Sequence, residues 1–246
     1  MVTQISKSSL FVNIPPRKIT NALEATIKSC DVCSKNGIKL DQACDKCRGI
    51  NTILRRYVDA NIPVMYWRID MQKHFTGEKY VLDRYNEIIA DLAVTYDNGL
   101  CICFAGSHGV GKSLLTTNVL KRVVTKGYSG LYVTLGDVVD SIVSFTNEQK
   151  MAARQKLLEV DFLVIDEFDS RHMGSDAASD LYGRILEGVF RTRVQNKLPL
   201  LMCTNSPNVV ESFGGALKKS IESLMNYVEI VPVIGKDFRK TQQGDT

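Results

Sequence analysis

The sequence lacks any apolar run long enough to cross a bilayer, and residues 1–10 lack the basic and then apolar pattern of a secretory signal peptide. It also has no internal repeat and no low-complexity segment. From these absences we expect a cytoplasmic protein with no membrane partner. What is present, 44% apolar and 24% charged residues in a chain of 246, is typical of a folded globular protein with one ordinary domain and one small module.

Net charge is also low, at +4, but it is unevenly distributed. Residues 1–60 hold ten Lys or Arg against five Asp or Glu, so the remainder is close to neutral. A basic segment of this size either contacts phosphate backbones or is a solvated surface, and the count alone does not separate the two.

Seven cysteines without an export signal indicate reduced thiols or metal ligands rather than disulfides. Four of them form two CxxC pairs ten residues apart: Cys30, Cys33, Cys44 and Cys47. Four thiolates at this spacing suit tetrahedral zinc. The segment that holds them has too few apolar residues to form a core, so zinc binding would supply the folding free energy that burial cannot. Unrelated reduced thiols are the alternative. Cys101, Cys103 and Cys203 lie in apolar strands and are better explained as small buried hydrophobes.

The composition changes near Asn61, from a Cys-rich basic stretch to a regular alternation of strand and helix patterns. Strands are predicted at residues 100–105, 130–134, 161–165, 198–204 and 228–233. Helices are predicted at 112–126, 136–159, 177–195 and 216–226. Strands separated by helices predict an α/β fold with a parallel sheet flanked by helices. We therefore divide the chain into an N-terminal module (residues 1–60), a core domain (61–240) and a polar tail (241–246).

One segment fits the phosphate-loop pattern G-x-x-x-x-G-K-[ST] and lies between a predicted strand and a predicted helix: Gly106, Ser107, His108, Gly109, Val110, Gly111, Lys112 and Ser113. The glycines allow backbone N–H groups to surround phosphates, Lys112 reaches the β- and γ-phosphates, and Ser113 offers a hydroxyl to Mg²⁺. Leu114, the next residue, completes the predicted ATP-binding set. A chance Gly-rich turn is the alternative, and His108 is read as a variable position without chemistry.

Two further strands end in polar side chains at the edge where the phosphate loop should lie. Asp166 follows the apolar strand at 161–165 and is the predicted Mg²⁺ ligand, while Glu167 is placed to orient and polarise the attacking water. A helix N-terminal Asp-Glu pair is the less favoured interpretation. Asn205 follows the strand at 198–204, where an amide contacts the γ-phosphate or where the residues simply form a turn before Pro207.

With these three features in order, residues 66–239 resemble the DnaC and DnaI type of replicative helicase loader. Further matching features are Tyr66-Trp67, Phe75, Leu198-Pro199 and Gly235-Lys236-Asp237-Phe238-Arg239. The resemblance implies an AAA+ ATPase of the initiator group that contacts single-stranded DNA and self-assembles when ATP binds. It also implies that the N-terminal module docks on a hexameric replicative helicase, that residues 66–86 shape the adenine pocket, and that Asn205 senses the nucleotide.

The sequence departs from the loaders at one point. Where they carry a Ser-Arg pair that supplies an arginine finger to a neighbouring subunit, this chain has Lys218-Lys219-Ser220-Ile221. Lys219, Arg191 and Arg193 are the candidates for a substitute, although each is also explained as a solvated helix charge. Hydrolysis is therefore expected to be slow or dependent on a partner.

Other functions remain open at this point. An IstB-like transposition helper shares the ATPase region and would favour duplex DNA, and the cysteine module argues against it. A binding protein switched by nucleotide with little turnover is supported by the missing Ser-Arg pair. A small-molecule kinase is disfavoured because Glu167 is placed for water and no acceptor-binding motif is evident.

Overall fold

The computed structural model describes residues 11, 14–33, 37–39, 42–169, 176–213, 215–235 and 237. Some of the residues named above lie outside the described ones, namely Lys236, Phe238, Arg239 and the tail at 241–246. Within the described residues, no helix combines the length and the apolar character needed to cross a membrane.

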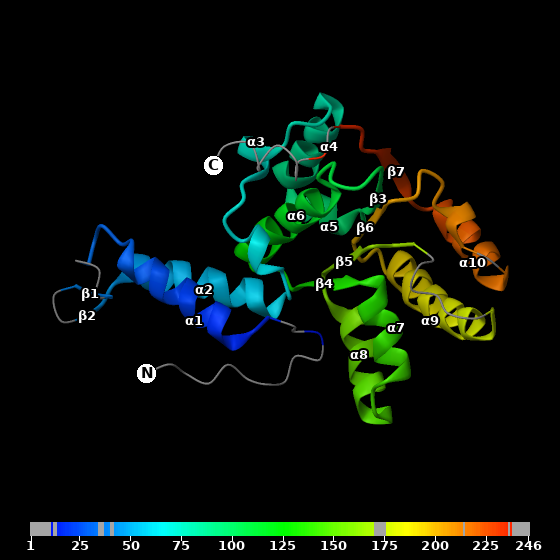
Figure 1. The fold of residues 1–246 in the computed structure, drawn as a ribbon, viewed down its shortest axis with the longest axis horizontal. Helices are drawn as coiled ribbons and strands as arrows, with labels where there is room; N and C mark the ends of the chain where they lie inside the picture. The colour runs from blue at the N-terminus through cyan, green and yellow to red at the C-terminus, as the bar shows by residue number, and fades with distance from the viewer. Residues whose placement is uncertain are drawn as a thin grey trace.

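A five-stranded sheet forms the centre of the molecule (Figure 1). Its strands are β3 (Cys101–Ala105), β4 (Gly130–Thr134), β5 (Phe162–Asp166), β6 (Leu200–Thr204) and β7 (Glu229–Pro232). They lie in the order β4-β5-β6-β3-β7, and every neighbouring pair is parallel. The predicted α/β fold with a parallel sheet is therefore confirmed.

Side chains alternate between the two faces of the sheet, as the period of a strand requires. In β3, Ile102 and Phe104 join one buried cluster and Cys103 and Ala105 join the other. The first cluster is covered by α4 (Lys79–Ala90) and α6 (Lys112–Lys126), and the second by α7 (Leu135–Val143), α8 (Asn147–Glu159), α9 (Asp176–Gln195) and α10 (Gly215–Met225). A short 3-10 helix, η3 (Val210–Ser212), precedes α10.

Local signals explain where several helices begin and end. Helix α6 starts after Gly111 and ends at Gly127, both in the left-handed conformation that favours glycine, and its bounds match the prediction. The predicted helical stretch at 136–159 is two helices, because Thr134 and Thr146 each form a capping box and so begin a new helix.

The N-terminal part is a pair of helices joined by a small hairpin. Helix α1 (Pro16–Lys28) packs along α2 (Asp45–Asp59), and strands β1 (Ile38–Lys39) and β2 (Gln42–Ala43) lie at the end of the pair that projects from the sheet (Figure 1). The other end of α2 is part of the main core, where Val58 is buried. There, Arg56 donates hydrogen bonds to the carbonyls of Val124 (3.1 Å) and Thr125 (3.0 Å) in α6.

A connecting segment runs from α2 to the sheet. It contains the 3-10 helix η1 (Val64–Tyr66) and the helices α3 (Met71–His74), α4 and α5 (Leu92–Asp97). Trp67 is buried in this segment and donates its indole N–H to the Ile62 carbonyl at 2.7 Å. The segment therefore packs as part of the core, beside the helix that follows the phosphate loop.

Arg193, near the end of α9, is fully buried, with 0% of its surface exposed. Its guanidinium donates to backbone carbonyls near the end of α8 and just before β5 and β6: Leu157 (2.9 Å), Leu158 (3.5 Å), Val160 (2.9 Å), Asp161 (3.1 Å) and Pro199 (2.7 Å). Burial lowers the pKa of Arg193 to about 10, which leaves it charged at neutral pH. The suggestion that Arg193 reaches a neighbouring subunit is therefore wrong, since its side chain is enclosed by its own domain.

Replacing Arg193 with leucine should lower the free energy of unfolding by about 3 kcal/mol, because buried carbonyls lose their donors. Arg191→Leu on the same helix is the matched control. Arg191 is exposed and pairs with Glu187 at 2.6 Å, so its loss should change stability by less than about 0.5 kcal/mol. Urea unfolding measures both changes, and equal changes in the two variants would contradict this role for Arg193.

Candidate functional site

The predicted phosphate loop connects β3 to α6, so backbone N–H groups at the start of a 15-residue helix face the site. Gly109 and Gly111 have φ values of +80° and +96°, a region that other residues rarely adopt. At Gly106, an added Cβ would lie 2.2 Å from the carbonyl oxygen of Val233, in the segment that follows β7. The loop thus requires glycine for its own turn and for close contact with a neighbouring segment.

Lys112 is the first residue of α6, and only 6% of its surface is exposed. Its ammonium group donates to the carbonyls of Gly106 (2.8 Å) and Ser107 (2.6 Å) at the start of the loop. A buried cation held at the loop in this way is placed to bind an anion that the loop N–H groups surround. The geometry fits the triphosphate of a nucleotide.

Asp166 ends β5 and is buried at 6% exposure, with its carboxylate at the carboxyl edge of the sheet. It accepts hydrogen bonds from the Tyr132 hydroxyl (2.7 Å) and from the N–H of Glu167 (2.8 Å). Burial, and then the neighbouring Asp166, raise the pKa of Tyr132, so its hydroxyl stays protonated and donates. Tyr132 thus orients the carboxylate that we predicted as the Mg²⁺ ligand.

Glu167 directly follows the strand and adopts a left-handed backbone conformation, with φ of +52°. This conformation is uncommon for a residue other than glycine, and such strain is found at functional sites more often than elsewhere. The turn exposes the Glu167 side chain while Asp166 stays buried. The two carboxylates therefore occupy different environments, which suits two different roles.

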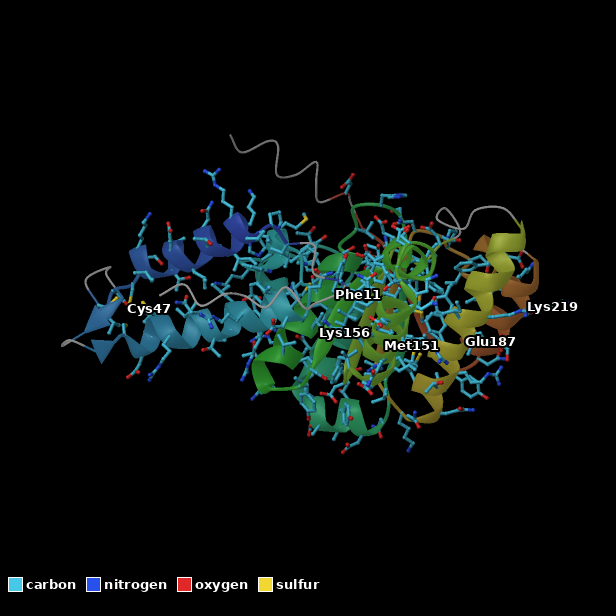
Figure 2. All side chains as sticks on the ribbon, turned by 90° about the horizontal axis from the view of Figure 1, so that it is seen from below. Phe11, Cys47, Met151, Lys156, Glu187 and Lys219 are labelled. Atoms are coloured by element: carbon cyan, nitrogen blue, oxygen red, sulfur yellow. The ribbon has the colours of Figure 1, made fainter. Side chains whose placement is uncertain are left out.

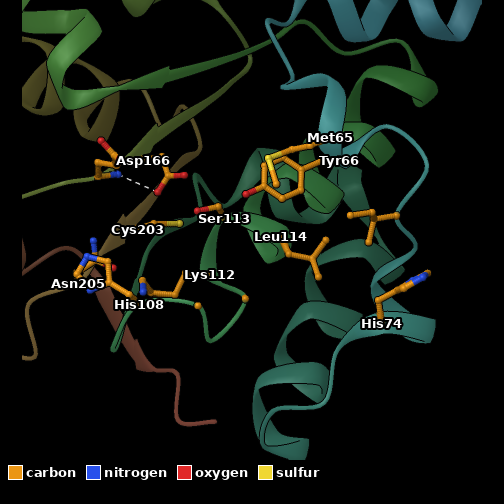
Figure 3. Close-up of a pocket in the computed structure, with 14 residues that line it drawn as sticks. Met65, Tyr66, His74, His108, Lys112, Ser113, Leu114, Asp166, Cys203 and Asn205 are labelled. Atoms are coloured by element: carbon orange, nitrogen blue, oxygen red, sulfur yellow. Dashed lines mark hydrogen bonds between the residues drawn. The ribbon is translucent and has the colours of Figure 1, made fainter. Parts of the chain in front are cut away.

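The strand order brings Asn205 to the same place. Because β6 lies between β3 and β5, its carboxyl end falls between the phosphate loop and Asp166. Asn205 lies just beyond that end and lines the cleft with Lys112 and Glu167 (Figure 3). The Thr204 hydroxyl accepts a hydrogen bond from the N–H of Ser206 at 3.1 Å, which forms a turn here. A turn at this point is compatible with an Asn205 side chain that faces the cleft.

These residues line one cleft with two chemically different ends (Figure 3). Lys112, Ser113, Asp166, Glu167 and Asn205 make the polar end. The other end is formed mainly by apolar or aromatic side chains with one imidazole: Met65, Tyr66, Ile69, His74 and Leu114. An apolar wall beside an anion-binding loop suits a flat base attached to a phosphate chain.

Several residues in or behind the cleft were not found by sequence reasoning. Tyr132 reaches Asp166 from β4 because the two strands pair in parallel register, and a lone Tyr in an apolar strand gives no sign of this. His74 lies within residues 66–86, which the resemblance indicated only as a region, and Met65 lies just before it. Cys203 is fully buried, as predicted, yet its sulfur lies against the cleft and contacts the Thr116 hydroxyl at 3.4 Å.

The four cysteines of the two CxxC pairs come together at the projecting end of the α1–α2 pair (Figure 2). Their sulfur atoms all lie within 4.8 Å of one another, with 3.9 Å between Cys30 and Cys44 and 3.6 Å between Cys33 and Cys47. Tetrahedral zinc bound to four thiolates requires sulfur–sulfur distances of about 3.8 Å. The cluster therefore has a geometry that can hold a metal ion.

The two remaining candidates for a contact to a neighbouring subunit are both exposed. Lys219 lies on α10, and Arg191 lies on α9 paired with Glu187 (Figure 2). The neighbouring Lys218 is paired with Glu211 at 2.7 Å.

No family model matches the chain. A curated relative, the uncharacterized protein YdaV from Escherichia coli (strain K12), is 28% identical over 93 residues, which are 37% of this chain and 36% of that protein. The chain therefore matches only about a third of that relative's length.

Solved structures match a larger share of the chain. DnaI superposes with a TM-score of 0.57 and 16% identity, covering 72% of this chain and 94% of DnaI. A primosome component from Streptococcus pyogenes serotype M3 gives 0.56 and 16%, covering 72% and 92%. The DnaC helicase loader gives 0.52 and 17%, covering 69% of this chain and 99% of that chain. At these identities the comparison shows a shared fold: the chain is similar in fold to DnaI and the DnaC helicase loader, the loaders that the sequence resembles.

Proposed function

We propose that this protein is an ATP-dependent helicase loader for DNA replication. The observation that carries the proposal is one cleft in which Lys112, Ser113, Asp166, Glu167 and Asn205 meet, within a fold shared with DnaI and the DnaC helicase loader. A structure of the replication initiator DnaA bound to AMPPCP and single-stranded DNA also shares this fold, with a TM-score of 0.53 over 68% of this chain and 50% of that one. The proposed site of action is the cytoplasm.

In the proposed ATP hydrolysis, each residue at the polar end of the cleft has a separate role. The loop N–H groups and Lys112 bind and neutralise the phosphates, and the Ser113 hydroxyl and the Asp166 carboxylate hold Mg²⁺, which would polarise the phosphate being transferred. Glu167 orients a water molecule in line with that phosphate and accepts its proton as the water oxygen bonds to the γ-phosphorus, while the bond to the bridging oxygen breaks and ADP leaves. Asn205 contacts the γ-phosphate and so distinguishes ATP from ADP.

The projecting end of the N-terminal module is the proposed docking site for a hexameric replicative helicase. Zn²⁺ bound by Cys30, Cys33, Cys44 and Cys47 would hold this end together. Two apolar side chains beside the cysteines are exposed there, Val32 at 40% and Ile50 at 38%. Exposed apolar residues on a small, rigid, metal-bound unit favour contact with protein over contact with DNA.

Single-stranded DNA and further copies of the chain complete the proposed set of partners. Helix α8 carries Lys150 and Arg154, two cations suited to a phosphate backbone. Lys219 and Arg191, both exposed, are the proposed contacts to the nucleotide of a neighbouring subunit. Such a contact would make self-assembly depend on ATP, because a cation that binds the γ-phosphate of a neighbouring subunit finds that phosphate in ATP and not in ADP.

Glu167→Gln tests the proposal with the host's replicative helicase. The amide keeps the size of the side chain but is a poor base, so turnover should fall at least about 100-fold while ATP still binds. The variant should therefore hold the ATP-dependent complex with the helicase longer than the wild-type chain does. Size-exclusion chromatography with light scattering, with and without ATP and single-stranded DNA, measures the complex.

Glu159→Gln, an exposed carboxylate at the end of α8, is the matched control and should leave turnover unchanged. The loader proposal fails if neither chain binds the helicase in ATP, or if the ATP-bound chain assembles on duplex DNA instead. That second outcome would support the transposition helper.

A further inference from the structure

Lys121 is a buried cation that the proposed ATP chemistry does not use. It lies in the middle of α6, and only 9% of its surface is exposed. Burial lowers the pKa of Lys121 to about 8, so the side chain is still mostly protonated at neutral pH. Because a buried ammonium group is costly without acceptors, its partners indicate what it does.

Three backbone carbonyls accept hydrogen bonds from the Lys121 ammonium group: those of Ile69 (2.6 Å), Tyr66 (2.9 Å) and Trp67 (3.5 Å). They lie at and just beyond the C-terminal end of η1, where carbonyls have few partners in the backbone; the Tyr66 carbonyl also accepts the N–H of Ile69 at 3.3 Å. The charged groups near Lys121 are Asp70, which favours its charge, and Arg122, which opposes it. Lys121 thus joins the helix of the phosphate loop to the connecting segment.

Two of the three carbonyls that Lys121 holds belong to residues of the apolar wall of the nucleotide cleft. Tyr66 and Ile69 both line that wall, together with Met65, which is 68% exposed (Figure 3). Lys121 itself is not among the residues that line the cleft. Since Lys112 begins the same helix, the distance between the wall and the phosphate loop is set through α6.

We propose that Lys121 is a positioning residue that fixes the base-binding wall at the correct distance from the phosphate loop, and so sets the affinity for the adenine nucleotide without touching it. This inference depends on the proposed ATP binding. The inference predicts different effects on two parts of the ligand, because the phosphates would contact the loop and the base would contact the wall. Loss of Lys121 should therefore affect only ligands that carry a base.

The experiment compares MgATP with magnesium tripolyphosphate, which has the phosphates but no base, by calorimetry on the full chain. Lys121→Met should weaken ATP binding about tenfold and change tripolyphosphate binding less than twofold. Lys121→Arg keeps the charge and the donors and should recover most of the ATP affinity. Lys126→Met, at the exposed end of the same helix, is the control and should match the wild-type chain.

Equal weakening of both ligands by Lys121→Met would show a general structural role and overturn the inference, as would no change in either. If Lys121→Met does not fold, Lys121→Gln, which has two N–H donors but no charge, replaces it in the same comparison. Weaker binding of ATP alone would again support the inference, and equal weakening of both ligands would again overturn it. Failure of the wild-type chain to bind either ligand would instead overturn the proposed ATPase, whatever Lys121 does.

Discussion

Lys112→Ala should weaken MgATP binding by at least about 100-fold, which corresponds to about 3 kcal/mol, and should abolish ATP turnover. The reason is electrostatic, since Lys112 is buried at 6% exposure and is the cation at the end of the cleft where the phosphates bind. The loop N–H groups remain in the variant, but they cannot neutralise the triphosphate without it. Calorimetric titration and a phosphate-release assay measure the two effects.

Lys126→Ala on the same helix controls for the loss of a lysine, because Lys126 is exposed at the far end of α6. Lys112 also donates to Gly106 and Ser107, so the loop of the variant requires a separate check. An unchanged thermal midpoint with lost binding would assign the effect to phosphate contact. Wild-type turnover in Lys112→Ala would rule out this cleft as the ATP site.

Removal of zinc should unfold the projecting end of the N-terminal module while leaving ATP binding in place. Among the residues that the structure describes in this region, the cysteine cluster consists of the four cysteines with the partly buried Ile27 packed against it, which is a very small apolar core. In small domains of this kind, zinc binding contributes about 10 kcal/mol or more of folding free energy. Chelation should therefore expose the region from Cys30 to Cys47 to proteases, and purified protein should contain one zinc per chain.

Cys44→Ser should lose zinc and become sensitive to proteases in the same region. Cys101→Ser is the matched control, because Cys101 lies in β3 outside the cluster and should not affect zinc content. Mass spectrometry under native conditions and elemental analysis report the metal. A wild-type chain purified without zinc, and still resistant to proteases between these residues, would contradict the proposal.

The sequence predicted the elements whose ends are marked by residues close to them in the chain. The bounds of α6 and β4 agree with prediction because glycines mark both ends of that helix and the strand is a continuous apolar run. Asp166, Glu167 and Asn205 meet in one cleft because the carboxyl ends of parallel strands share an edge of the sheet. That consequence follows from the fold class alone, without any knowledge of side-chain contacts.

What could not be predicted depends on contacts between distant elements. The bond from Tyr132 to Asp166 requires the register of two strands, and the bonds of Lys121 require the path of a connecting segment 52 to 55 residues away in sequence. Arg193 was misjudged for the same reason. An arginine near a helix end is usually solvated, and only the packing of α9 against the starts of β5 and β6 shows that this one is enclosed.

The contact between α2 and α6 has a mechanical consequence. Helix α6 begins at the phosphate loop and runs for 15 residues, about 22 Å, to the carbonyls that Arg56 holds. Helix α6 thus connects the phosphate loop to the base of the projecting module, where α2 packs in the main core. We therefore expect a change at the phosphate loop to reach the cysteine end through the packed helices α6 and α2 rather than through a flexible linker.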